Sequence, residues 1–176
     1  MLWITHGERD IYRSDWVGLA LVDVEVPGIA RYDHHVIRVP KEAVGVVVHD
    51  EEHGVLLIYR HRVITHSWGY EIPAGSVEVD EDLAVAAARE VLEETGWQPG
   101  PVTPTLRFFP SNGLSDQVFN IFEASHAEYV GEPSDPSESE RVEWLSLPRL
   151  RDLLVSGGIT DGLSLTALSH WYLKRE

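Results

Sequence analysis

The stretch that decides the fold runs from Gly75 to Trp97 and reads GSVEVDEDLAVAAAREVLEETGW. Its apolar residues recur at the spacing of one buried helical stripe. Acidic residues at 80–82 precede them, where the positive end of a helix would lie. Gly96 stands where a helix commonly ends in the left-handed conformation. We therefore predict a helix that begins near Leu83 and ends at Gly96.

Three carboxylates come together on this predicted helix. Glu90 and Glu94 share a face, and Glu93 lies at the edge of that face. Carboxylates one turn apart repel one another, but a hard divalent cation that takes oxygen ligands turns the repulsion into attraction. Arg89, four residues before Glu93, can pair with it and hold it in place. The pattern predicts a metal site.

The plainer interpretation of a Glu-rich helix is a solvated surface face. The segment before the helix counts against it, because EIPAG at 71–75 is a Pro/Gly turn placed to bring a backbone carbonyl to the same acidic cluster. Glycines and charges at fixed offsets along the whole stretch also favour the metal site.

This stretch resembles the Nudix box, G-x5-E-x7-R-E-U-x-E-E-x-G-U, in which U is a bulky apolar residue. Every fixed position matches, and Trp97 fills the last apolar position, where an aliphatic residue is commoner. The resemblance covers about residues 16–170 and is strongest to the ADP-ribose and nucleoside diphosphate sugar pyrophosphatase branch. EIPAG at 71–75 is similar to that branch's E-x-P-A-G, FPSNGLSDQ at 109–117 to its Y-P-S-P-G-x-[ST]-D-E, and GITD at 158–161 to its C-terminal G-x-I-x-D.

Three departures from that branch stand out. Asn112 replaces a second proline, Gln117 replaces a glutamate, and RHR at 60–62 stands where Q-Y-R is usual. If Gln117 faces the ligand, the substrate can differ from ADP-ribose.

The resemblance implies a Mg²⁺-dependent hydrolase, with Mn²⁺ as an alternative ion, that cleaves the pyrophosphate of ADP-ribose or a related nucleoside diphosphate sugar. ADP-ribose would give AMP and ribose 5-phosphate. The implied metal ligands are the carbonyl of Ala74 and the side chains of Glu90, Glu93, Glu94 and Glu140. The implied catalytic residues are Glu93, Arg89 as its orienting partner, and Glu138 as the base in an acidic loop.

Substrate-binding candidates follow from residue chemistry. Arg62 lies at the end of a predicted strand that precedes the site in sequence, and its guanidinium can donate two hydrogen bonds to phosphate oxygens. Arg60 is a second candidate. Glu71 can accept from the nucleoside or pair with Arg62. Trp68 offers an apolar ring for the base, although a tryptophan is more often part of the core.

The composition of the chain excludes several classes of protein and of site. The 176 residues are 43% hydrophobic and can bury a core, and with no cysteine there can be no disulfide or zinc–thiolate site. The net charge of −15 disfavours nucleic acid and anionic membranes as partners. No apolar run is long enough for a membrane span, and the N-terminus lacks the apolar core of a signal peptide. We therefore expect a cytoplasmic enzyme that acts on a small-molecule substrate.

Residues 1–40 are predicted to form an N-terminal β-hairpin extension, with strands at 16–26 and 34–39, ahead of a catalytic domain at 41–176. In the resembled branch such an extension packs across a two-fold axis, which implies a homodimer. In the second part we expect a mixed sheet with helices on both sides, an α/β/α sandwich of the Nudix type. Its predicted strands are 43–49, 55–59, 117–124 and 142–145, and its later helices are 148–156 and 163–174.

Three other functions stay open. The departures at Asn112 and Gln117 leave room for a Nudix hydrolase of a dinucleotide or an oxidised nucleotide. A non-catalytic nucleotide sensor is a second alternative, against which the intact Glu90, Glu93 and Glu94 argue. A structural domain with an acidic surface helix is the third.

Overall fold

The computed structural model describes residues 1–134 and 139–175. The chain divides into two compact units, one of Met1–Glu42 with Phe109–Val118 and the other of Ala43–Phe108 with Phe119–Glu176. In the described residues, no helix combines the length and apolar character that crossing a membrane requires.

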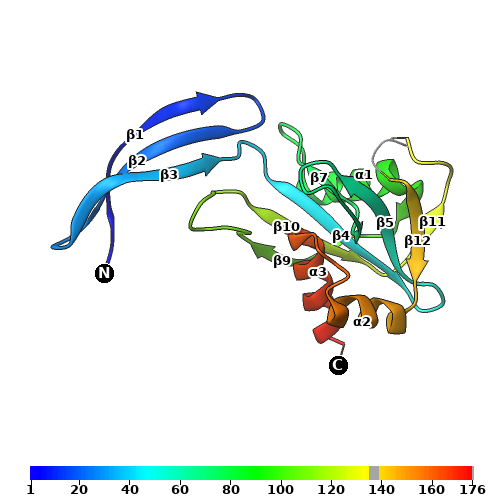
Figure 1. The fold of residues 1–176 in the computed structure, drawn as a ribbon. Helices are drawn as coiled ribbons and strands as arrows, with labels where there is room; N and C mark the ends of the chain where they lie inside the picture. The colour runs from blue at the N-terminus through cyan, green and yellow to red at the C-terminus, as the bar shows by residue number, and fades with distance from the viewer. Residues whose placement is uncertain (135–138, 176) are drawn as a thin grey trace. The chain divides into compact units, whose positions relative to one another are not determined.

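The first unit is a three-stranded antiparallel sheet in the order β1-β2-β3 (Figure 1). Its strands are β1 (Ile4–Arg13), β2 (Gly18–Val26) and β3 (Ala30–Arg38). The predicted hairpin is present as β2 and β3, and Gly28 supplies the positive φ of 74° that its turn needs. Strand β1 is an addition to the prediction. Every residue of β1 is exposed, so its sequence carries no alternation of apolar and polar residues.

The segment at 109–118 is tied to the end of β3. The backbone N–H of Ile37 donates to the carbonyl of Leu114 at 2.8 Å, and that of Val39 donates to Asp116 Oδ1 at 2.9 Å. Arg38 also pairs with Asp116 at 3.1 Å. These bonds explain why residues distant in sequence form one unit.

The second unit contains a seven-stranded mixed sheet. Its main path is β12-β5-β4-β10-β9, β6 pairs with β5, and β7 pairs with β4. Only the β4–β10 pair is parallel among the pairings of this sheet in the described residues. The strands are β4 (Ala43–Asp50), β5 (Gly54–Arg62), β6 (Ser67–Glu71), β7 (Ala74–Ser76), β9 (Thr103–Phe108), β10 (Phe119–Ala124) and β12 (Arg141–Leu145). A separate two-stranded sheet pairs β8 (Trp97–Pro99) with β11 (Ala127–Tyr129).

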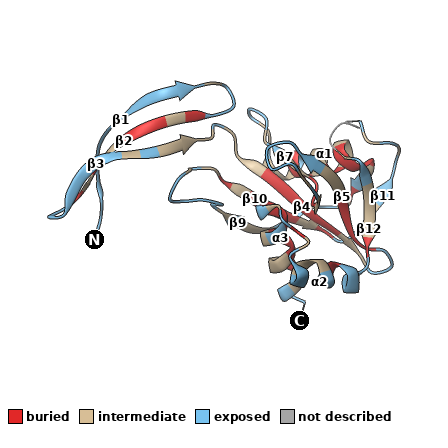
Figure 2. Ribbon diagram, in the orientation of Figure 1, coloured by how far each residue is buried: buried red, intermediate tan, exposed pale blue. Residues whose placement is uncertain are grey.

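Helices cover both faces of the seven-stranded sheet, as the α/β/α prediction requires. Helix α1 (Leu83–Thr95) packs on one face, where Val91 joins Val46 and Leu56 in a buried cluster. Helices α2 (Leu147–Ser156) and α3 (Gly162–Leu173) pack on the other face in a second buried cluster. Strands β4 and β5 contribute side chains to both clusters, so they are buried along most of their length (Figure 2).

Helix α1 begins and ends where the sequence predicts. The Asp82 carboxylate accepts from the backbone N–H groups of Ala84 and Val85, which satisfies two donors of the first turn. Gly96 has φ of 72°, and its N–H donates to the carbonyl of Leu92. The acidic residues of the last two turns are thereby held in a fixed helical register.

The C-terminal end of α3 is joined to β4 by a histidine. Arg175 lies 4.0 Å above the Trp171 ring, and its NH2 is 2.9 Å from His49 Nε2. Burial lowers the pKa of His49 below its ordinary 6.5, and the charge of Arg175 lowers it further. Since Arg175 can only donate, His49 Nε2 accepts and the ring is neutral.

This contact predicts a pH-dependent stability. The unfolded chain binds a proton on His49 more readily than the folded chain, so the free energy of unfolding should fall as pH drops below about 6.5. His49→Gln keeps a side chain that can accept from Arg175 but cannot titrate. Urea unfolding between pH 8 and pH 5 should show a smaller loss for this variant than for the wild type. An equal loss in both proteins would show that His49 does not contribute.

Candidate metal and phosphate site

One cavity of about 300 Å³ in the second unit gathers most of the predicted metal ligands. We call it the acidic cavity. It is bordered by β5, β7 and α1. Its lining residues are Arg60, Arg62, Ala74, Gly75, Ser76, Glu90, Glu93 and Glu94. The structure thus brings together, from three separate elements, four of the five predicted metal ligands and both candidate phosphate-binding arginines.

Glu94 is the most deeply placed of the carboxylates, at 2% exposed. The backbone N–H of Ala74 donates to Glu94 Oε2 at 2.8 Å, and Arg60 NH1 donates to Glu94 Oε1 at 3.3 Å. Removing such a carboxylate from water is costly unless it is paired and hydrogen-bonded, and here both conditions are met. The turn at 71–75 therefore contacts the helix through Ala74.

Glu90 lies directly against the backbone of Gly75. A Cβ atom built at Gly75 would overlap the Glu90 carboxylate group. Gly75 is paired with Val44 in the β4–β7 ladder, so its backbone cannot readily withdraw. A side chain at this position would therefore displace the Glu90 carboxylate.

Arg89 pairs with three acidic residues that lie in α1 or just before it. Its guanidinium donates to both oxygens of Glu81 at 2.8 and 2.9 Å, to Glu90 at 2.8 Å and to Glu93 at 2.9 Å. It also donates to the carbonyl of Ser76 at 3.1 Å. The bond to Glu81, followed by those to Glu93 and Glu90, raises the pKa of Arg89 well above its ordinary value. The pairing of Arg89 with Glu93 that the sequence suggested is present.

Arg89 should stabilise the metal-free protein more than the metal-loaded one. Arg89→Met leaves neighbouring carboxylates without their shared cation, which we expect to cost about 2 kcal/mol of unfolding free energy without metal. A bound cation would replace part of the lost charge, so urea unfolding in Mg²⁺ should show a smaller loss. Arg151→Met, an exposed change in α2, is the control. Equal losses with and without Mg²⁺ would contradict a metal site beside Arg89.

The donors of the acidic cavity are carboxylate and backbone oxygens, which fit a hard divalent cation. In this structure the carboxylates are turned to arginines and to a backbone N–H. Among the described residues, no three His, Cys, Asp or Glu side chains converge on one point as a metal group. A bound ion would therefore have to compete with Arg60 and Arg89 for these oxygens.

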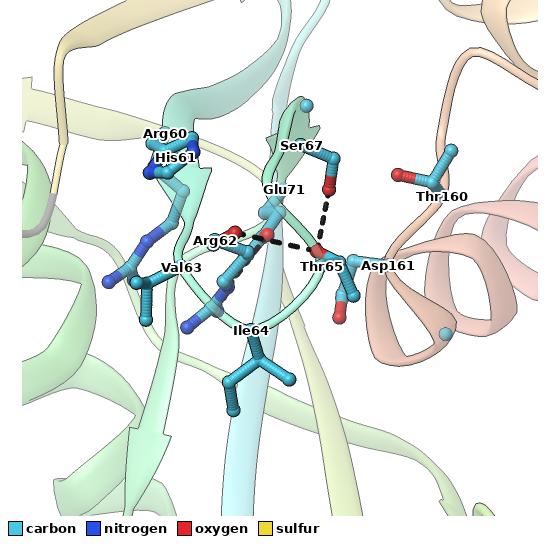
Figure 3. Close-up of a pocket in the computed structure, with 12 residues that line it drawn as sticks. Arg60, His61, Arg62, Val63, Ile64, Thr65, Ser67, Glu71, Thr160 and Asp161 are labelled. Carbon is cyan, nitrogen blue, oxygen red and sulfur yellow. Dashed lines mark hydrogen bonds and ion pairs between the residues drawn. The ribbon is translucent and has the colours of Figure 1, made fainter.

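A second cavity, of about 770 Å³, lies along the β5–β6 hairpin, and we call it the hairpin cavity. Arg60 and Arg62 line it as well as the acidic cavity. Figure 3 shows these arginines on one side and Thr160 and Asp161, which lead into α3, on the other. Its lining residues are Arg60, His61, Arg62, Val63, Ile64, Thr65, Ser67, Gly69, Glu71, Thr160, Asp161 and Gly162.

Glu71 pairs with Arg62, which is one of the two roles that its position suggested. Arg62 Nε and NH2 lie 2.9 and 2.5 Å from the two Glu71 oxygens, and Glu71 is 4% exposed. This bidentate ion pair raises the pKa of Arg62. It also fixes the guanidinium of Arg62, which lines both cavities.

The other predicted site residues lie elsewhere. Trp68 is about half exposed and stacks on Tyr59 with ring centroids 5.6 Å apart, but it is not among the lining residues of either cavity. Glu140 is exposed and borders a different cavity of about 540 Å³ beside Trp97. Glu138 lies outside the described residues.

Contacts made by three further side chains of the site could not be predicted from the sequence. The Arg60–Glu94 pair joins β5 to α1. The Ser139 hydroxyl donates to the carbonyl of Glu94 at 3.2 Å, so the end of the acidic loop touches the helix. The buried hydroxyl of Ser164 accepts from the N–H of Ile72 at 3.1 Å and donates to Asp161 at 2.7 Å, which ties α3 to the turn. Only Arg60 had a signal in the sequence, as a departure from the usual glutamine.

Comparison with known proteins agrees with this geometry. The model of the NUDIX domain matches residues 39–160, and the chain belongs to the Nudix family. Its curated relatives include ADP-ribose and GDP-mannose pyrophosphatases, and the chain is a Nudix hydrolase that acts on pyrophosphate bonds.

Two curated relatives cover nearly the whole chain. A CMP-5′-(N-acetyl-N-hydroxy-3-aminopropyl)phosphonate hydrolase of Streptomyces rubellomurinus is 38% identical over 170 residues, 96% of this chain and 82% of the relative. An ADP-ribose pyrophosphatase of Bacillus subtilis is 27% identical over 172 residues, 97% of this chain and 92% of the relative.

A solved structure supports the fold. The crystal structure of an ADP compounds hydrolase superposes with a TM-score of 0.84 at 23% identity, covering 99% of this chain and 96% of that one. The predicted Nudix-type mixed sheet between helices is therefore confirmed.

Proposed function

We propose that the chain uses Mg²⁺, or Mn²⁺ in its place, to hydrolyse the pyrophosphate of ADP-ribose or a related nucleoside diphosphate sugar. The observation that carries the proposal is the acidic cavity, where acidic oxygens and two arginines line one space. A diphosphate bound with a divalent ion needs both, because its charge must be neutralised before water can attack phosphorus.

The candidate metal ligands and the candidate base have separate roles. The carbonyl of Ala74 and the carboxylates of Glu90, Glu93 and Glu94 would hold metal, and Glu140 in the acidic loop would assist. A bound ion neutralises phosphate charge and lowers the pKa of the attacking water. Glu138 is the proposed base.

The other candidate side chains orient a metal ligand or bind the substrate. Arg89 orients Glu93 through the 2.9 Å bond, so it is a positioning residue. Arg62 and Arg60 bind phosphate oxygens, and Glu71 holds Arg62 in place. Trp68 is the proposed partner of the base, from a position outside the lining of both cavities.

A second candidate substrate is a cytidine monophosphate joined to a phosphonate. The relative from Streptomyces rubellomurinus, 38% identical, favours it. The bond between a phosphate and a phosphonate has the same two charged centres and places the same demands on the acidic cavity.

A substrate panel tests the proposal. The protein would be incubated with Mg²⁺ or Mn²⁺ and ADP-ribose, GDP-mannose, a CMP–phosphonate anhydride, a dinucleoside polyphosphate or an oxidised nucleotide, with products followed by phosphorus NMR. We expect the highest kcat/KM for ADP-ribose with release of AMP. A preference for the CMP conjugate would establish the second candidate. Binding without turnover of any compound would identify a sensor and contradict the proposal.

We also propose that residues 1–40 form the contact of a homodimer. The first unit exposes several large apolar side chains on its small sheet and just before it, among them Trp3, Ile11 and Tyr32. Burying apolar surface of this kind would favour association. Analytical ultracentrifugation should give twice the chain mass of 19.8 kDa, and a single-chain mass at micromolar concentration would contradict the dimer.

A further inference from the structure

Arg60 holds a carboxylate that a metal ion would need. Arg60 NH1 lies 3.3 Å from Glu94 Oε1, and the two side chains are 14% and 2% exposed. The other oxygen of Glu94 accepts from the backbone N–H of Ala74. A guanidinium therefore supplies positive charge at the place where the proposed function requires a cation.

Arg60 also borders the space beyond this carboxylate. It lines the hairpin cavity together with Arg62, and Figure 3 shows both arginine side chains extending the same way from the end of β5. The arginine side chain has several rotatable bonds, so its guanidinium can shift between the two cavities while its backbone stays in the sheet.

We propose that Arg60 is an exchangeable counter-ion, which pairs with Glu94 in the metal-free protein and moves to the diphosphate when a divalent cation takes Glu94. This inference rests on the proposed function. A guanidinium and a divalent cation that share one carboxylate oxygen bring two positive charges close together, and their repulsion weakens the hold of each on Glu94. Either cation would stabilise the buried Glu94 carboxylate, because a buried charge is costly unless it is paired.

The exchange couples two binding events. Arg60 opposes the metal for as long as it holds Glu94, and it favours the phosphate once it is displaced. By linkage, a residue with these two roles changes the two affinities in opposite directions when it is removed.

The test measures Mn²⁺ binding by electron paramagnetic resonance on the full chain without substrate. Arg60→Gln should bind Mn²⁺ on the order of tenfold more tightly than the wild type, in the range usual for coupled sites. Arg60→Lys keeps the charge and should stay near the wild type. Arg151→Gln removes an equal charge from an exposed position of α2 and should change nothing.

The second arm measures binding of methylenediphosphonate at a fixed, saturating concentration of free Mn²⁺. This probe has no base and no hydrolysable bond, so the result does not depend on the physiological substrate. Arg60→Gln should bind it on the order of tenfold more weakly. Thermal unfolding of each variant checks that the fold is retained. A merely structural role would weaken both affinities together.

The outcomes separate the inference from the function on which it rests. If Glu94→Gln abolishes Mn²⁺ binding but Arg60→Gln leaves it unchanged or weaker, the exchange is wrong and the metal site stands. If Arg60→Gln tightens Mn²⁺ but leaves the diphosphate unaffected, transfer of Arg60 to phosphate is wrong. If the wild type binds no Mn²⁺, the proposed function fails together with the inference.

Discussion

Glu94→Gln is expected to lower kcat by about 10²–10³-fold while leaving the fold intact, because loss of one electrostatic partner of the transition state has effects of this size. The change removes the charge that would hold a cation but keeps the shape of the side chain. The amide oxygen of glutamine can still accept from the N–H of Ala74, which Glu94 does at 2.8 Å. The measurement is steady-state kinetics over a Mg²⁺ titration, with the thermal midpoint recorded for the same samples.

Glu123→Gln is the matched control, since Glu123 is a half-buried carboxylate of β10 that pairs with Arg175. It should keep wild-type kcat. An active Glu94→Gln variant with unchanged Mg²⁺ dependence would show that metal is not held at this carboxylate, whatever its effect on stability.

Gly75→Ala is expected to reduce kcat/KM by about 10–100-fold, the usual size of an effect on groups that orient metal ligands. The added methyl group would occupy the position of the Glu90 carboxylate. The Glu90 carboxylate would have to shift, which would change its 2.8 Å bond to Arg89, because Gly75 is held by its pairing with β4. Kinetics at several Mg²⁺ concentrations should show a raised metal requirement.

Gly7→Ala tests whether the effect is specific to the site. A Cβ at Gly7 meets no atom within 4 Å, and the residue lies in the exposed strand β1. This variant should match the wild type. If Gly75→Ala is equally active, Glu90 is free to relocate and its placement against the glycine has no role in catalysis.

Much of the second unit could be predicted because its signals are local. The Asp82 cap, the apolar run from Leu83 and the left-handed Gly96 all act within α1, so its ends follow from the sequence. The spacing of Glu90 and Glu94 likewise determines that they share a face. The uninterrupted apolar runs of β4 and β5 are typical of strands buried on both sides.

The parts that escaped prediction depend on contacts between distant segments. Strand β1 is held by its backbone pairing with β2, and ion pairs such as Arg9 with Asp33, 2.8 Å apart, are exposed, so no apolar face marks the strand in the sequence. The Arg60–Glu94 bond joins residues 34 positions apart, and only the packing of α1 on β5 brings them together. The acidic loop shows the same limit, because Glu140 borders a different cavity from Glu90.

The central claim is that the carboxylates of α1 and the Ala74 carbonyl hold a divalent cation beside the diphosphate. The most direct test is a crystal soaked with Mn²⁺ and methylenediphosphonate, with the ion located by its anomalous scattering. The account predicts manganese in the acidic cavity, coordinated by Glu90 and Glu94 and by an oxygen of the diphosphate. Manganese bound elsewhere, or a diphosphate held by arginines alone with Glu94 still paired to Arg60, would contradict it.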